Sequence, residues 1–170
     1  MRNKVVDAAE AVAIIRSGDT VASSGFVGVG TPDEIISALE RRFVQTGEPR
    51  DLALVFAAAP GDGLDRGLNR LAHPGLIKRL IGGHFGLVPK LARMAVDNHV
   101  EAYNLPLGCV SHLFREIAGR KAGLLSKVGF GDLRRPHQWW REAQRKDHRR
   151  AGAIAGDRRR AVAFLQGFSD

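Results

Sequence analysis

Glycines gather where the chain is expected to turn, and glycine-rich turns can bring backbone N–H groups close to a phosphate or a thioester. The first group, Gly25-x-x-Gly28-x-Gly30, follows a short extended run and precedes Thr31-Pro32. A helix that begins there would point its free N–H groups at negative charge. The spacing does not match the dinucleotide fingerprint G-x-G-x-x-G. Anion or thioester binding is one interpretation of this loop, and tight turning alone is the other.

The other candidates for chemistry are six histidines, one cysteine and two neighbouring aspartates. The histidines at 73, 84, 99, 112, 137 and 148 show no i, i+4 pair and no carboxylate at ligand spacing, so no metal site is predicted. Only His84, after Gly82-Gly83 at a strand end, stays a candidate. Cys109 is expected at a helix start, which can activate a thiol, but no basic partner is implied and a buried small residue is predicted. Asp62 and Asp65 could pair, yet Arg66 beside them favours a solvated turn.

Strands alternating with helices must position these residues. The sequence predicts strands over 20–23, 52–58, 77–83 and 100–104, and helices over 7–16, 32–46, 87–98 and 110–119. Thr31 suits the N-cap of the second helix and Pro32 its first position. The apolar face of that helix is expected at Ile35, Ile36, Leu39 and Phe43. The pattern predicts an open α/β domain with a mostly parallel sheet flanked by helices, in which loops at the carboxyl ends of the strands bind ligands.

The composition fits a folded single domain. The 170 residues are 44% hydrophobic, and the single cysteine excludes an internal disulfide framework and a cysteine-based zinc site. No apolar run approaches the ~20 residues that a membrane helix needs. The N-terminus also lacks the apolar block of a signal peptide. We therefore expect a cytoplasmic protein with no membrane partner.

Three longer stretches resemble the class I coenzyme A transferases. GDTVASSGFVGVGTPDEIISALERRF looks like the family's N-terminal pattern of a strand, then G-F-x-x-x-G-x-P, then a helix. PRDLALVFAAAPGDGLDRGLNRLAHPGLIKRLIGGHFGLVPKLARM and EAYNLPLGCVSHLFREIAGRKAGLLSKVGFG look like the same α-type half of the acetate/acetoacetate and propionate CoA-transferases. The resemblance implies a NagB/RpiA-like fold. It also implies transfer of CoA between a short-chain acyl-CoA and acetate, propionate or a 3-keto acid, without a metal or redox cofactor.

The resemblance also implies which loops bind the acyl group or CoA. These contain Gly25, Phe26, Val27, Gly28, Gly30, Gly82, Gly83, His84, Asn104, Leu107 and Gly108. No catalytic residue is expected, because the family's glutamate nucleophile lies in a β-type half and no glutamate here is followed two positions later by glycine. Where the family has N-L-P-Q-G, Leu107 replaces the glutamine that helps to stabilise the thioester oxyanion. The resemblance further implies that the intact enzyme is a homo-oligomer.

The sequence changes character near Asp132. Residues 133–170 hold ten Lys+Arg against four Asp+Glu, and so most of the net charge of +8. The family continues there as G-T-F-V-D-P and a glycine-rich G-G-K-L-N. Back-translation of residues 132–149 with one base removed reads T-F-V-D-P-T-S-G-G-G-K-L-N-E-R-T-T. We therefore predict part of an α-type domain over 1–131 and an out-of-frame, poorly structured basic tail over 132–170.

Three functional interpretations remain open. The first is the N-terminal portion of a CoA-transferase, truncated and inactive alone because the β-type half is absent. The second is a non-catalytic partner subunit that needs a separate β half. The third is a nucleic-acid arm over Arg134–Arg160, with cations for phosphates and Trp139-Trp140 for base stacking. Because residues 1–132 are nearly neutral and need no polyanion, nucleic acid ranks below the transferase interpretations.

Overall fold

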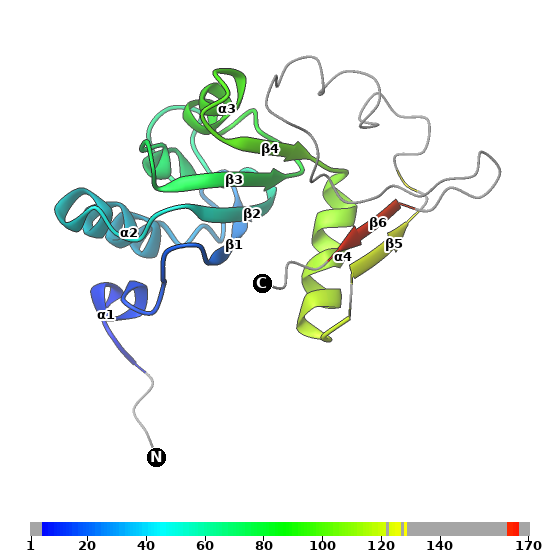
Figure 1. The fold of residues 1–170 in the computed structure, drawn as a ribbon, viewed down its shortest axis with the longest axis horizontal. Helices are drawn as coiled ribbons and strands as arrows, with labels where there is room; N and C mark the ends of the chain where they lie inside the picture. The colour runs from blue at the N-terminus through cyan, green and yellow to red at the C-terminus, as the bar shows by residue number, and fades with distance from the viewer. Residues whose placement is uncertain (1–4, 122, 127, 129–162, 167–170) are drawn as a thin grey trace.

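The described part of the chain is built around a parallel four-stranded sheet (Figure 1). The computed structural model describes residues 5–121, 123–126, 128 and 163–166. Strands β1 (Thr20–Phe26), β2 (Leu52–Ala58), β3 (Ile77–Gly82) and β4 (Glu101–Asn104) lie in the order β1-β2-β3-β4. The connections hold α2 (Asp33–Thr46), the 3₁₀ helix η1 (Leu68–Leu71) and α3 (Pro89–Val96). This confirms the predicted open, mostly parallel α/β architecture.

A smaller unit follows the sheet along the chain. Helix α4 (Leu107–Ala118) leads to β5 (Gly123–Ser126), which pairs antiparallel with β6 (Ala163–Gln166) (Figure 1). Apart from β6, the predicted basic tail falls outside the described residues, as do the boundary at Asp132, Trp139-Trp140, His137 and His148. None of the described helices is long and apolar enough to cross a membrane.

Strand β2 is the centre of the core because both of its faces are covered. Leu52, Leu54 and Phe56 pack in the larger cluster with residues of α1 (Ala8–Val12), α2 and α3. Val55 points to the other face, where it packs with Ile81 and with Val110 of α4. An uninterrupted apolar run is what a parallel strand buried on both faces requires. The predicted range of this strand, 52–58, is confirmed.

Two predicted helix boundaries are wrong by three residues or more, for different physical reasons. The first helix was expected over 7–16 but ends at Val12. The Arg42 guanidinium of α2 donates hydrogen bonds to the carbonyls of Val12, at 2.5 Å, and Ile15, at 2.9 Å, so a distant side chain satisfies them. The last helix was expected over 110–119 but begins at Leu107, directly after Pro106. Leu107 and Gly108 therefore lie in its first turn and not in a loop.

Candidate functional site

Parallel strands place the loops that follow them at one edge of the sheet, which we call the carboxyl edge. It comprises the segments 27–32, 59–67, 83–88 and 105–106, which follow β1 to β4 in turn. The three groups of residues singled out from the sequence, 25–30, 82–84 and 104–108, all lie at or next to this edge (Figure 1). The fold therefore brings the predicted binding loops to the same side of the molecule, where open α/β sheets bind ligands.

The turn after β1 presents apolar side chains to solvent. Phe26 and Val29 exchange two backbone hydrogen bonds, both 3.0 Å, across Val27 and Gly28. Phe26 is 56% exposed and Val29 is 80% exposed. Val27 has a φ of 55°, a left-handed conformation that β-branched residues rarely adopt. This turn is an exposed apolar tip, and two of its N–H groups are already used inside the turn.

Thr31 fastens this turn and does not cap α2, as the sequence had predicted. Its hydroxyl donates to the carbonyl of Val27 at 2.9 Å, and Pro32 occupies the N-cap position with no side-chain cap. A Cβ on Gly25, whose φ is 110°, would lie 2.5 Å from that hydroxyl oxygen, so only glycine fits there. Ile35, expected in the apolar face of α2, is 38% exposed, while Ile36 and Leu39 are buried as predicted.

Replacing Thr31 by valine tests the hydroxyl in the turn. Valine keeps the shape of threonine but leaves the Val27 carbonyl without its donor. We therefore expect the free energy of unfolding to fall by about 0.5–1.5 kcal/mol. Denaturant titration of the variant measures this change. Thr31→Ser keeps the hydroxyl and should restore most of the loss. Equal stability of the wild type and Thr31→Val would show that the bond to Val27 contributes nothing.

Two glycines, the last residue of β3 and the one after it, let three segments approach closely. A Cβ on Gly82 would lie 2.6 Å from the Phe56 ring. One on Gly83 would lie 2.5 Å from the carbonyl oxygen of Ala57 and 2.7 Å from the Cα of Leu107. The start of α4 is therefore held against the ends of β2 and β3. His84, which is exposed, follows directly, and a Cβ on Gly86 would lie 2.9 Å from its Nε2.

The end of β4 places three of the predicted binding residues in a short stretch. The Asn104 Oδ1 atom is buried and has no hydrogen-bond partner among the described residues. Leu107 is 45% exposed and begins α4, with Gly108 after it. Backbone N–H groups in the first turn of a helix have no intrahelical partner and carry partial positive charge. This stretch therefore holds N–H groups that can bind an acceptor and, three residues before Leu107 in the chain, a buried oxygen that lacks a donor.

Asp62 and Asp65 do not form a carboxylate pair. The Asp62 carboxylate accepts hydrogen bonds from the N–H groups of Leu64, at 2.9 Å, and Arg66, at 3.0 Å. These backbone hydrogen bonds hold the pKa of Asp62 below its usual value, and the bond from Leu64 has the largest effect. Asp65 instead pairs with Lys90 at 2.6 Å. The alternative prediction of a solvated turn is confirmed.

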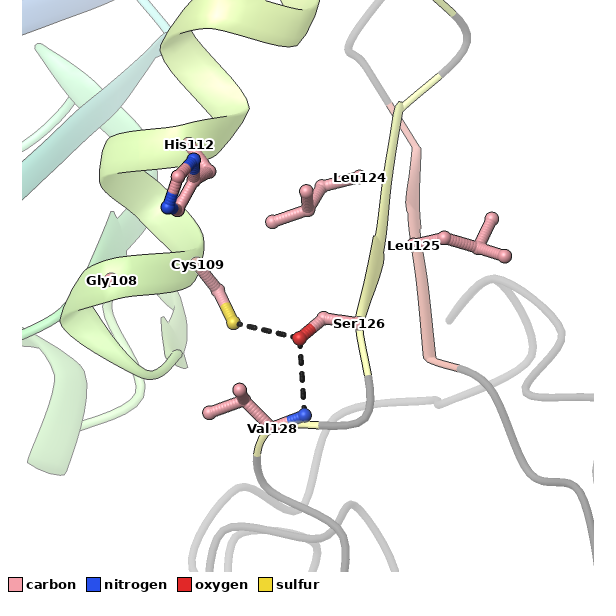
Figure 2. A pocket seen from close by; sticks show the side chains of 7 residues that line it. All are labelled: Gly108, Cys109, His112, Leu124, Leu125, Ser126 and Val128. Atoms are coloured by element: carbon pink, nitrogen blue, oxygen red, sulfur yellow. Dashed lines mark hydrogen bonds between the residues drawn. The ribbon is translucent and has the colours of Figure 1, made fainter.

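Cys109 is buried at 5% exposure, as predicted, and lines a cavity between α4 and β5 (Figure 2). The cavity volume is about 420 Å³. The thiol donates to the Ser126 hydroxyl at 3.6 Å, which accepts from the Val128 N–H at 3.0 Å. His112 also lines the cavity. Within the described ranges, no group of three or more His, Cys, Asp or Glu residues could hold a metal ion.

Tyr103 of β4 gives the carboxyl edge a spectroscopic reporter, because it is the only tyrosine of the chain. Burial raises its pKa above the usual 10.0, the nearby Glu101 carboxylate raises it further, and Arg79 opposes them. Glu101 and Arg79 form an ion pair at 2.7 Å.

We expect tyrosinate absorbance of the folded chain to titrate above pH 10.0, the value expected of the chain in denaturant. Because the pKa of Tyr103 is higher in the folded chain, its contribution to the free energy of unfolding is complete at any pH below the pKa of the unfolded chain. That contribution is lost as the pH rises through the folded value. Glu101→Gln should lower the midpoint. A folded midpoint at or below that of the denatured chain would contradict this environment.

Asn69 is a site residue that sequence reasoning missed. It is 1% exposed and makes three hydrogen bonds to the segments after β2 and β3. The sequence places Asn69 next to Arg70, between Leu68 and Leu71, which does not by itself indicate a buried amide.

Comparison with known proteins gives consistent matches. The family model described as coenzyme A transferase matches residues 5–156. Acetate CoA-transferase YdiF of Escherichia coli (strain K12) is 34% identical over 138 residues, which are 81% of this chain and 26% of that protein. The alpha subunit of acetate CoA-transferase from the same strain is 28% identical over 133 residues, 78% of this chain and 57% of that subunit.

A solved structure agrees with these matches. The acyl-CoA transferase YdiF of E. coli O157:H7, in a thioester complex with CoA, superposes with a TM-score of 0.83 at 27% identity. The match covers 96% of this chain and 34% of that one. The chain thus spans about a third or less of the length of YdiF.

Proposed function

This chain belongs to the coenzyme A transferase family, and we propose from that premise that it supplies the N-terminal, α-type part of an acyl-CoA:carboxylate CoA-transferase. The reaction moves CoA between a short-chain acyl-CoA and acetate, propionate or a 3-keto acid. The CoA thioester is substrate, and the proposal involves no further cofactor. The observation that carries the proposal is the convergence of segments 25–30, 82–84 and 104–108 at the carboxyl edge.

The carboxyl edge is suited to binding and orienting a thioester. Phe26 and Val29 offer exposed apolar surface for an acyl chain or for the methylene groups of CoA. The first turn of α4, at Leu107 and Gly108, offers backbone N–H groups to a carbonyl oxygen or a phosphate. Asn104 ends β4 just before this turn, but its Oδ1 atom is shielded from solvent and is not itself offered to a ligand. The other groups hold the substrate, and none is a nucleophile.

The nucleophile comes, in this proposal, from a β-type half. In covalent carboxylate catalysis a glutamate attacks the thioester carbonyl and expels the CoA thiolate, which forms an acyl-glutamyl anhydride. The thiolate then attacks the glutamyl carbonyl, which gives glutamyl-CoA and releases the first carboxylate, and the reverse steps pass CoA to the second carboxylate. No glutamate of these 170 residues has the sequence context of that nucleophile. The β-type half is joined in the same polypeptide or bound as a separate subunit, and an E. coli relative is itself named an alpha subunit. We expect the assembled enzyme to be a homo-oligomer of such units.

Acetyl-CoA binding to the chain tests the proposed site without catalysis. We expect the amide resonances of residues 25–30, 83–84 and 104–108 to shift on addition of acetyl-CoA, while those of α1 stay in place. Acetyl-pantetheine, which lacks the nucleotide, should shift the segment 104–108 with lower affinity. No shift at saturating acetyl-CoA, or shifts confined to residues outside the carboxyl edge, would contradict the site.

We also propose that residues 132–170 are translated from a shifted reading frame. The support is the back-translation of residues 132–149, which restores the family continuation when one base is removed. Sequencing the gene across the Gly131–Asp132 junction should reveal an extra base. Independent reads that keep the frame would contradict the proposal, and the family match as far as residue 156 would then describe an in-frame continuation.

A further inference from the structure

Asn69 is a buried polar side chain whose hydrogen bonds lead to the carboxyl edge and to the start of α3. It lies in η1 beside Leu68 and Leu71, which are 0% and 1% exposed. Its Nδ2 donates to the carbonyls of Arg66, at 3.2 Å, and Leu87, at 3.0 Å. Its Oδ1 accepts from the N–H of Lys90 at 3.2 Å. The amide thus uses both of its donors and one acceptor position in a place that water does not reach.

These bonds join two loops that the chain keeps apart. Arg66 belongs to the segment after β2, whereas Leu87 and Lys90 belong to the segment after β3 and to the start of α3. The Leu87 carbonyl accepts a second bond from the N–H of Gly63, at 3.0 Å. A Cβ on Gly61 would lie 2.4 Å from that same carbonyl oxygen. The two loops therefore meet backbone to backbone, with the Asn69 amide at the junction.

The Lys90 bond also replaces a missing helix cap. Val88 is the N-cap residue of α3 and provides no side-chain hydrogen bond, and Pro89 follows it. The Lys90 N–H would otherwise lack a partner, as N–H groups in the first turn of a helix do. Asn69 supplies the acceptor from another element. The direction of α3 is thereby coupled to the segment after β2.

A third connection, after the Asn69 amide and the backbone bond between Gly63 and Leu87, is weaker. Lys90 and Asp65 form an ion pair at 2.6 Å, but their side chains are 50% and 77% exposed. Exposed ion pairs contribute little because solvent screens them. Removing the buried amide, in contrast, leaves the Arg66 carbonyl and the Lys90 N–H without this partner and takes one of two donors from the Leu87 carbonyl. The buried connection through Asn69 therefore dominates.

We propose that Asn69 is a positioning residue that holds the 59–67 loop and the 83–88 loop together as one unit, so that the His84 segment meets the CoA thioester in a fixed place. The effect of Asn69 on CoA transfer rests on the proposed function. The hydrogen-bonded connection itself is independent of that function. Asn69 touches no reacting atom and acts through the backbone of the two loops.

Amide hydrogen exchange in Asn69→Leu tests the connection on the chain itself. Leucine has nearly the same volume and removes all three hydrogen bonds. We expect the Gly63 and Lys90 amides to exchange about 10-fold faster or more. Losing one hydrogen bond lowers the free energy of local opening by about the amount that gives a tenfold change in exchange rate. The amides of Leu54 and Leu80 in the sheet should keep their rates. Equal acceleration at all four amides, or no acceleration at Gly63, would overturn the proposal.

The Michaelis constant for acetyl-CoA, measured in an assembly with a β-type half, tests whether Asn69 affects substrate binding. Misplacing a binding group by about 1 Å can cost about 10²-fold in kcat/KM. We expect Asn69→Leu to lose about that much for acetyl-CoA, with a raised KM. Leu39→Ala, buried on α2, lowers the folded fraction without touching either loop and should leave KM unchanged. Asp65→Asn removes only the exposed ion pair and should also leave KM unchanged.

The outcomes separate the two proposals. A wild-type assembly that transfers no CoA would contradict the proposed function, and hydrogen exchange would then decide the role of Asn69 alone. A wild-type assembly that transfers CoA, with an unchanged KM in Asn69→Leu, would overturn the positioning role. A raised KM in Asn69→Leu together with normal KM values in both controls is the result expected.

Discussion

Replacing Leu107 by glutamine is expected to raise the turnover of the assembled transferase by about 10²–10³-fold, the usual contribution of one oxyanion donor. Leu107 begins α4 at the carboxyl edge, is 45% exposed, and lies beside Gly83. An amide at this position could donate a hydrogen bond to the thioester oxygen, whereas the leucine side chain has no donor. The rate of CoA transfer from acetyl-CoA to propionate, assembled with a β-type half, measures the effect.

A methionine variant is the matched control for this gain. Leu107→Met has a similar length and no donor, so we expect its turnover to stay within about threefold of the wild type. An equal increase in both variants would assign the effect to shape and not to the amide. A glutamine variant with unchanged kcat would show that Leu107 does not face the reacting carbonyl.

Replacing Gly83 by alanine is expected to lower kcat/KM by about 10²-fold, as a displacement of about 1 Å in a binding segment can. The new Cβ would lie 2.5 Å from the Ala57 carbonyl oxygen and 2.7 Å from the Cα of Leu107. Both contacts are with backbone, so β2 or the start of α4 must move. Such overpacking also destabilises a protein by about 1–3 kcal/mol. Denaturant titration and steady-state kinetics measure the two effects.

Gly119→Ala adds the same methyl group at the other end of α4. Its Cβ would lie 3.3 Å from the Arg115 carbonyl, a milder contact far from the carboxyl edge. We expect a normal kcat/KM for this control. If Gly83→Ala folds with wild-type stability and keeps its kcat/KM, then the close approach of α4 to β3 does not matter for the site.

The sheet could be predicted from the sequence because its signals are local. Strand β2 is apolar throughout and its range was predicted exactly as the structure has it, since burial on both faces leaves no polar position. The end of α2 was also predicted, because Gly47 takes the left-handed C-cap conformation that favours glycine. At such positions the residue types alone indicate the local conformation, independently of contacts with distant residues.

The errors arise where a distant residue decides the local structure. The early end of α1 depends on Arg42, which lies 30 positions from Val12 along the chain. Thr31 was predicted as an N-cap, but its hydroxyl bonds to the turn that precedes it. Gly108 suggested a loop, yet the helix begins before it, directly after Pro106. Local propensity alone does not contain these contacts.

The candidate site was predictable as a set of segments and not as a geometry. The glycines at 25, 82 and 83 were recognised, and the structure shows which close contact requires each of them. Asn69 escaped notice because its partners Leu87 and Lys90 lie 18 and 21 positions away. A polar residue between leucines gives no indication of those partners before the fold is known.

The central claim is that these 170 residues hold the thioester and that a β-type half supplies the nucleophile. Transfer of CoA from acetyl-CoA to labelled propionate, measured for the purified chain with and without a β-type subunit, tests it most directly. We predict background rates for the chain alone and for the β-type subunit alone, and propionyl-CoA formation only when the two are combined. Turnover by the chain alone, or none from a combination shown to form a complex, would contradict the account.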